Sequence, residues 1–187
     1  MLQTKNLNQL VNCAICTTLT CILATITFKI GPVPITLANF ATYFSVGILT
    51  PKFAFLSQIL YIILVTMGFP FSSNFQGGLG YILGKTGGFI VGYAFIALIG
   101  SLIYNQFKFL NKNKANGFFK YFIFVLACEI GTLACYLCGL CWFMYLVKVN
   151  FIQAFTVCCL PFLIIDLLKI IIAYFIISKV QKFLKLF

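Results

Sequence analysis

Long apolar segments alternate with short polar, glycine-rich or proline-rich stretches along this chain of 187 residues. The apolar segments have the length of membrane-spanning helices, whereas a membrane barrel would show short segments of alternating polarity. We therefore predict an all-α integral membrane protein, a single domain with six transmembrane helices. The predicted spans are 9–30, 37–50, 53–68, 89–107, 118–146 and 162–180, with a partly helical connection over 147–161.

Composition supports this class and argues against a soluble protein. Hydrophobic residues make up 63% of the chain, charged residues make up 8%, and the mean hydropathy is +1.10. So little charge could not cover a water-soluble domain of this size. The net charge of +11 comes entirely from lysine. The lysines are scattered at loop ends instead of gathered on one face, so we expect no nucleic-acid partner and assign them to the lipid bilayer surface.

The lysines are unevenly divided between the two sides that six spans would define. Nine of them flank the N-terminus, the turn after the second span, the polar 108–120 segment and the C-terminus. The other side holds three, Lys29, Lys85 and Lys148. Because lysine-rich loops stay in the cytoplasm, we predict a multi-pass protein of the cell membrane with both termini cytoplasmic.

Asp166 and Lys169 place an acid and a base three residues apart inside the sixth span. Residues at this spacing share one face of a helix. A charge at membrane depth costs at least about 2.5 kcal/mol, so the pair is either an ion pair that holds helices in register or a ligand site. Glu129, the other acid of the chain, lies inside the fifth span and is either a neutral buried acid or a partner for Lys169.

Two irregular segments fall on the outer side in this topology. One is the Gly31–Thr36 turn with its two prolines, and the other is the glycine-rich stretch 71–88. Asp166 lies five residues after Pro161, or about 7.5 Å along a helix, and is therefore in the outer half of its span. Because non-helical backbone at membrane depth is tolerated where it lines a cavity, we predict an outward-open pocket for a small polar solute.

Two other chemical patterns are rejected. Gly84-Lys85-Thr86 resembles the end of a phosphate-binding loop, but Gly80 stands one residue too close and no buried strand precedes it. Cys135, Cys138 and Cys141 form overlapping C-x-x-C units, yet they lie in an apolar helix and the chain has no histidine. Buried free cysteine behaves as a small apolar side chain, so we predict no metal site and no disulfide.

Small residues repeat at four-residue spacing along the first span. Such rows let another helix approach closely within a membrane, and the sequence leaves open whether that helix belongs to this chain or to a partner. The first row is Cys13, Thr17, Cys21 and Thr25, and the second is Ala14 and Thr18.

Three segments together resemble the BioY family, the biotin-binding S components of energy-coupling-factor (ECF) transporters. They occur in the family's order over the length of the chain. They are Gly31-Pro-Val-Pro-Ile-Thr36, Asn74-Phe-Gln-Gly-Gly-Leu-Gly80 with Gly84 and Thr86-Gly-Gly88, and Leu160-Pro-Phe-Leu-Ile-Ile-Asp-Leu-Leu-Lys169.

The resemblance implies a six-helix subunit that captures biotin from outside and is not an enzyme. It also implies partners: an EcfT-type transmembrane coupling protein, contacted here by the Ala14 and Thr18 row, and two ATPases that use the ATP. No cofactor is implied in this chain. The residues that match the family's binding positions are Asn74, Asp166 and Lys169, and the matching motifs add Gly77, Gly78, Pro34 and Thr36.

Biotin chemistry suits these residues, because a carboxylate accepts from the ureido N–H groups while lysine and asparagine donate to oxygen. This chain departs from the family at Ile164-Ile165, where Pro-Gly is usual, which predicts a more regular start to the sixth helix. It also departs at Lys85, which replaces a proline and is predicted to pair with the biotin carboxylate. The competing interpretations are an S component for another vitamin and an intramembrane enzyme acting on a lipid or quinone.

Overall fold

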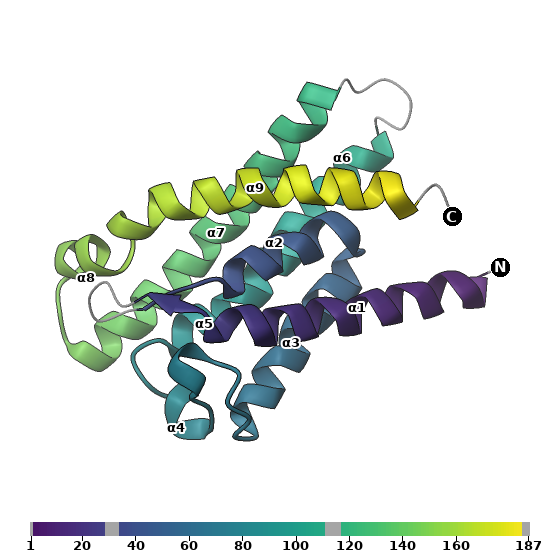
Figure 1. Ribbon diagram of the computed structural model, residues 1–187. Coiled ribbons are helices and arrows are strands. Elements are labelled where there is room, and N and C mark those ends of the chain that lie inside the picture. Colours follow the sequence, from purple (N-terminus) through teal and green to yellow (C-terminus); the bar gives the residue numbers. More distant parts are fainter. Residues whose placement is uncertain (1, 29–33, 111–116, 185–187) are drawn as a thin grey trace.

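The computed structural model of the protein describes residues 2–28, 34–110 and 117–184 and confirms the all-α class (Figure 1). The turn residues Gly31–Val33 and the loop lysines Lys29, Lys112, Lys114 and Lys185 lie outside the described residues. In chain order the elements are α1 (Leu2–Thr25), β1 (Thr27–Phe28), β2 (Ile35–Thr36), α2 (Ala38–Ile48), α3 (Pro51–Thr66), the 3₁₀ turn η1 (Ser73–Phe75), α4 (Leu79–Ile82), α5 (Gly87–Phe95), the π-helical turn η2 (Ile96–Gly100), α6 (Ser101–Leu110), α7 (Gly117–Val147), α8 (Phe151–Cys158) and α9 (Leu160–Leu184).

Among the described residues, four helical segments are long and apolar enough to cross a membrane, which indicates a membrane protein. They are Asn6–Thr25, Gly87–Leu110, Gly117–Val147 and Leu160–Gln181. Helix α3 is apolar but shorter, and α2 has 11 residues. At 1.5 Å per residue, α2 is roughly half as long as the hydrocarbon core is thick.

The first predicted span ends differently from the prediction of 9–30. Helix α1 stops at Thr25, and the next residues form an antiparallel pair in which Thr27 lies opposite Thr36 and Phe28 opposite Ile35. The apolar character of the sequence continues past Thr25, so hydropathy alone could not separate the strand from the helix. The strand pair places Thr36 directly before α2.

The helices bring the irregular segments together at one end of the molecule. The start of α1 and the end of α9 lie on one side, whereas the strand pair and α8 lie on the opposite side (Figure 1). The Thr27 hydroxyl donates to Asn74 Oδ1 at 3.4 Å, which joins the strand pair to the loop after α3. The loop after α3 is therefore joined to the strand pair that contains Thr36, the last residue of the other irregular segment.

One row of small residues on α1 is used inside the chain and the other is not. Cys13, Thr17 and Cys21 are buried, and the Thr17 hydroxyl donates to the Ser57 carbonyl of α3 at 3.0 Å. Ala14 and Thr18 are exposed, and the Thr18 hydroxyl is satisfied by the Ala14 carbonyl at 3.0 Å. The second row therefore forms an exposed helix face whose hydroxyl is already hydrogen-bonded.

Glycines allow α5 and α7 to pack in close contact. A Cβ at Gly88 would lie 2.4 Å from Trp142 Cβ, and one at Gly139 would lie 2.3 Å from the Phe89 ring. The Trp142 indole N–H also donates to the Gly84 carbonyl at 2.9 Å. The glycines near 84–88 thus serve close approach to a neighbouring helix, one of the two roles expected from the sequence.

Candidate functional site

Asp166 and Lys169 face each other on α9, as their spacing predicted. Lys169 Nζ lies 3.0 Å from Asp166 Oδ1. Asp166 is 3% exposed and Lys169 is 6% exposed, so both charges are removed from solvent. Helix α9 begins at Leu160 and continues past both residues without interruption. Ile164-Ile165 therefore lie within a regular helix, in keeping with the effect expected for the loss of Pro-Gly.

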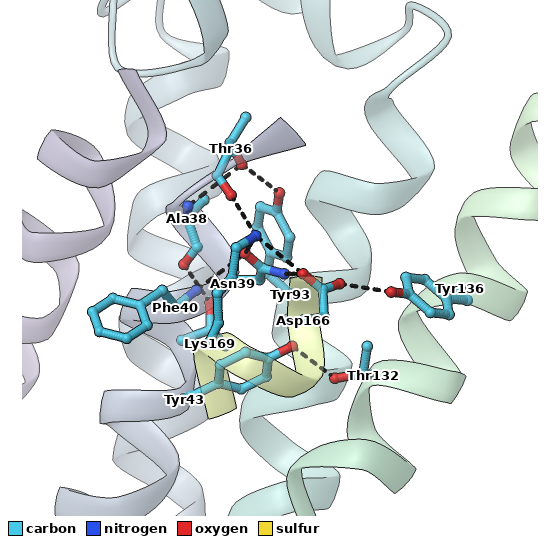
Figure 2. Close-up of polar contacts among 11 residues, drawn as sticks. Thr36, Ala38, Asn39, Phe40, Tyr43, Tyr93, Thr132, Tyr136, Asp166 and Lys169 are labelled. Atoms are coloured by element: carbon cyan, nitrogen blue, oxygen red, sulfur yellow. Dashed lines mark hydrogen bonds and ion pairs between the residues drawn. The ribbon is translucent and has the colours of Figure 1, made fainter. Parts of the chain in front are cut away.

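Asn39 of α2 connects the two charged groups. Its amide Nδ2 donates to Asp166 Oδ1 at 2.6 Å, and its Oδ1 accepts from Lys169 Nζ at 2.9 Å (Figure 2). Lys169 also donates to the Thr36 carbonyl at 2.9 Å. An ammonium has three N–H donors, and these three acceptors match that number. The lysine is thus held between α9, α2 and the strand pair.

Tyr136 of α7 completes the surroundings of the carboxylate. Its hydroxyl donates to Asp166 Oδ2 at 2.6 Å (Figure 2). Asp166 Oδ1 already accepts from Asn39 and Lys169, whereas Oδ2 accepts one bond from Tyr136. A carboxylate oxygen can accept two bonds, so Oδ2 retains capacity for a donor from a ligand.

A cavity opens beside this network. It encloses about 420 Å³ of empty space, counting the part open to solvent at its mouth. Small-molecule sites are typically lined by apolar side chains with a few converging polar groups, and the wall of this cavity has that character. The cavity is lined by Pro34, Thr36, Asn39, Phe89, Tyr93, Ile96, Thr132, Cys135, Tyr136, Cys158, Phe162, Asp166 and Lys169.

The remaining polar groups of the cavity wall are neutral and paired. The Tyr93 and Thr36 hydroxyls lie 3.3 Å apart, and the Thr132 hydroxyl lies 3.0 Å from Tyr43 (Figure 2). Burial raises the pKa of the Cys158 thiol to about 11, so this thiol is a neutral, weakly polar part of the wall. The charged chemistry of the cavity is therefore concentrated on the Asp166 and Lys169 pair.

The structure places four of the predicted binding residues in this cavity and four outside it. Asp166, Lys169, Pro34 and Thr36 line it. Asn74 is exposed in η1, and Lys85 is exposed in the segment between α4 and α5. Gly77 and Gly78 follow η1; a Cβ at Gly77 would lie 2.1 Å from the Phe69 carbonyl, and Gly78 has φ +97°. Both glycines are thus explained by the backbone of the loop.

Glu129 is not the partner of Lys169, whose donors point to other acceptors. One carboxyl oxygen of Glu129 is buried and has no hydrogen-bond partner among the described residues. These contacts exclude the pairing with Lys169, one of the two interpretations of this acid.

Asn39 and Tyr136 are functional candidates that the sequence did not reveal. Each lies within a predicted apolar span, where polar residues mark polar contacts inside membrane proteins. Asn39 was the easier of the two to find from the sequence, since it is an amide at the third residue of the predicted second span and three residues after Thr36.

The fold and the cavity define a helical membrane protein with an internal cavity that has a buried ion pair at its wall. The profile of the BioY family matches residues 1–186. The chain therefore belongs to the BioY family, which confirms the resemblance seen in its motifs.

Relatives and one solved structure support the same assignment. The probable biotin transporter BioY of Pyrococcus horikoshii is 33% identical over 163 residues, covering 87% of this chain and 90% of that protein. The biotin transporter BioY of Thermotoga maritima is 30% identical over 181 residues, covering 94% of this chain and 97% of that protein. The crystal structure of the S-component for biotin from an ECF-type ABC transporter has the same fold, with a TM-score of 0.82 and 23% identity over 97% of this chain and 95% of that one.

Proposed function

We propose that this protein captures biotin from the outer side of the cell membrane and delivers it as the S component of an ECF-type transporter. The observation that carries the proposal is the buried Asp166, Lys169 and Asn39 network at the wall of a cavity. The biotin transporters and the biotin S-component that share its family or fold support the same ligand. The chain then acts as a transport subunit and not as an enzyme.

Biotin matches the donors and acceptors of the cavity. Its ureido ring has two N–H donors and one carbonyl acceptor. Asp166 Oδ2, which accepts one bond from Tyr136, takes a ureido N–H. Lys169 and Asn39 donate to the other oxygen of that carboxylate and direct their N–H groups to the ureido carbonyl after a small rearrangement. The apolar wall, including Phe89 and Phe162, packs against the thioether ring.

The proposed topology has six spans with both termini in the cytoplasm. It rests on the lysine distribution, with α2 and α3 serving as shorter spans beside the four long ones. The start of α1 and the end of α9 lie on the same side of the molecule (Figure 1). This supports six spans, because an even number of crossings returns the chain to its starting side. The cavity beside the strand pair then faces outward. Asn74, Gly77 and Gly78 form part of the loop above it.

The proposed partners are an EcfT-type coupling protein and two ATPases that hydrolyse ATP. The Ala14 and Thr18 face of α1 is the proposed contact for the coupling protein. Small residues let helices approach closely in a membrane, and this face is exposed while the neighbouring row is buried within the chain.

Uptake of labelled biotin tests this function in cells that lack a biotin transporter and express this protein with its coupling protein and ATPases. We expect the Ala14→Leu variant to lose uptake while its purified form binds biotin as the unmodified protein does, because Ala14 is exposed on α1 and does not line the cavity. The control is Ile22→Leu, an exposed position on the same helix that keeps its bulk. Unchanged uptake by Ala14→Leu would remove this face from the coupling contact, and absence of uptake by the unmodified protein would contradict the function.

Lys85 is proposed to pair with the biotin carboxylate at the outer mouth. Its side chain is exposed, so the attraction is screened and we expect a loss of affinity of about two- to fivefold in Lys85→Ala. The loss should diminish at high salt. Titration with biotin at two ionic strengths measures it, with Lys148→Ala as the control for removal of a lysine elsewhere. Equal affinity of Lys85→Ala and the unmodified protein at low salt would exclude the pairing.

A further inference from the structure

Helix α8 connects the end of α7 to the start of α9, at the end of the molecule that carries the strand pair (Figure 1). A single residue, Cys159, separates it from α9. No charged residue occurs over 149–165. A connection that met water on its outer side would ordinarily contain charge, so the apolar character of α8 requires an explanation.

One face of α8 packs against the rest of the chain. Ala154 and Cys158 are buried in the hydrophobic core, which Phe162 of α9 also joins. Cys158 and Phe162 also line the cavity beside Asp166. Helix α8 is therefore part of the cavity wall, and its inner face is occupied by contacts within the chain.

The opposite face of α8 is exposed and mostly apolar. Ile152 is 77% exposed, and Phe151 and Val157 are exposed beside it. Thr156 lies on the same face, and its hydroxyl donates to the Ile152 carbonyl at 2.7 Å. Because this hydroxyl is satisfied within its own helix, it can face hydrocarbon without losing a hydrogen bond. The one exposed amide of α8 is that of Gln153.

The exposed face of α8 adjoins a helix that is long enough to cross a membrane. Helix α9 contains the apolar segment Leu160–Gln181, and Leu160 and Ile164 at its start are exposed. At 1.5 Å per residue this segment is about 33 Å long, close to the thickness of the hydrocarbon core. Leu160 therefore lies near one boundary of the hydrocarbon, and α8 lies at nearly the same depth.

The length of α7 explains how the chain comes back to this boundary. Its 31 residues extend about 46 Å, which is more than the thickness of the hydrocarbon core. Lys148, directly after α7, is exposed and has φ 57°. The chain turns back here toward the start of α9 and forms α8 on the way (Figure 1). A lysine at such a turn is well placed for lipid headgroups.

We propose that α8 is an interfacial helix whose outer face, formed by Phe151, Ile152 and Val157, contacts the acyl chains of the bilayer. Lipid is the occupant because this face is uncharged and adjoins the exposed apolar start of a membrane-spanning helix. Helix α8 then separates the cavity from lipid, with Cys158 on one side and Val157 on the other. The inference goes beyond the proposed function and holds for any ligand in the cavity.

Labelling from within the bilayer tests this contact on the unmodified full chain. The protein is reconstituted into phosphatidylcholine vesicles that contain a lipid with a photoactivatable diazirine in its acyl chain. Labelled positions are then identified by mass spectrometry. We expect label in 151–157 at a level comparable to that in 163–168, the exposed start of α9.

Tryptophan quenching measures the depth of α8. Trp142→Phe removes the single tryptophan of the chain, and Ile152→Trp then adds one on α8. Leu168→Trp is the matched control, because Leu168 is exposed on α9 and lies about 12 Å along the helix from Leu160. We expect bromines near the headgroup to quench position 152 more strongly, and bromines deep in the acyl chain to quench position 168 more strongly.

The labelling result decides the proposal even where the tryptophan variants fold poorly. Label in 163–168 without label in 151–157 would overturn it. In that case, modification of 151–157 by a water-soluble reagent would show that the face meets water. Protection from both reagents would show that a second copy of the chain or another protein covers it. Label in both segments, with shallow quenching at position 152, supports the interfacial helix.

Discussion

Asp166→Asn is expected to lower biotin affinity about 100-fold or more and to destabilise the protein. The change keeps the shape of the residue but removes the negative charge beside Lys169, at 3.0 Å and away from solvent. Loss of one partner from a buried pair costs about 3–5 kcal/mol because the other charge stays buried and unpaired. Binding suffers in addition, because the carboxylate oxygen that accepts a ureido N–H is replaced in part by a donor.

A double variant separates these two effects. Asp166→Asn with Lys169→Met removes both charges and keeps the length of the second side chain. We expect thermal melting in detergent to return toward that of the unmodified protein, since replacing a whole buried pair is often nearly neutral. Biotin affinity should remain as low as in Asp166→Asn. Recovery of biotin binding in the double variant would show that the pair holds the fold and does not contact the ligand.

Gly88→Ala is expected to give a large loss of stability outside the site. A Cβ at this position would lie 2.4 Å from Trp142 Cβ and 2.9 Å from the Cys138 carbonyl, so α5 and α7 must separate. Overpacking of this kind costs about 1–3 kcal/mol or more, because it displaces backbone as well as side chains. Fluorescence of the chain's single tryptophan, Trp142, and melting temperature in detergent measure the effect.

Gly80→Ala provides the matched control in the neighbouring segment. Gly80 is exposed in α4, and a Cβ there has no atom within 4 Å. Its melting temperature should equal or slightly exceed that of the unmodified protein, because alanine is the better helix former. A similar loss in both variants would mean that the glycine-rich segment responds to flexibility and not to the contact with Trp142.

The sequence was sufficient to predict what depends on composition and local spacing. Long apolar segments and scarce charge predicted a helical membrane protein, and the three-residue spacing of Asp166 and Lys169 predicted their shared face. The row of Cys13 and Thr17 could be recognised as a helix-packing face. The sequence could not show that this row is buried while the Ala14 and Thr18 row is exposed, since both rows have the same small-residue spacing.

Other features depend on which distant segments meet. Asn39 contacts Asp166 across 127 positions of sequence, and Tyr136 contacts it from a third helix. Local patterns do not contain such pairings. The end of α1 at Thr25 likewise depends on the pairing of Thr27 with Thr36, which outcompetes helix in a segment that remains apolar.

The predicted loop residues also show the difference between what a local motif predicts and what the contacts of the fold determine. Gly77 and Gly78 were selected because they match a family motif, and the structure gives them a backbone role next to Phe69 and at a positive φ. Asn74 has φ 56°, a conformation that asparagine tolerates better than most residues. Its contact to Thr27 connects the loop with the strand pair. Their proposed contact with ligand remains a prediction.

Equilibrium binding of labelled biotin to the purified full chain, in competition with other vitamins, tests the central claim most directly. We predict saturable binding of one biotin per chain with a Kd in the nanomolar range, resistant to an excess of other vitamins and lost in Asp166→Asn. Saturable binding of another vitamin without binding of biotin, or biotin binding that persists unchanged in Asp166→Asn, would contradict it.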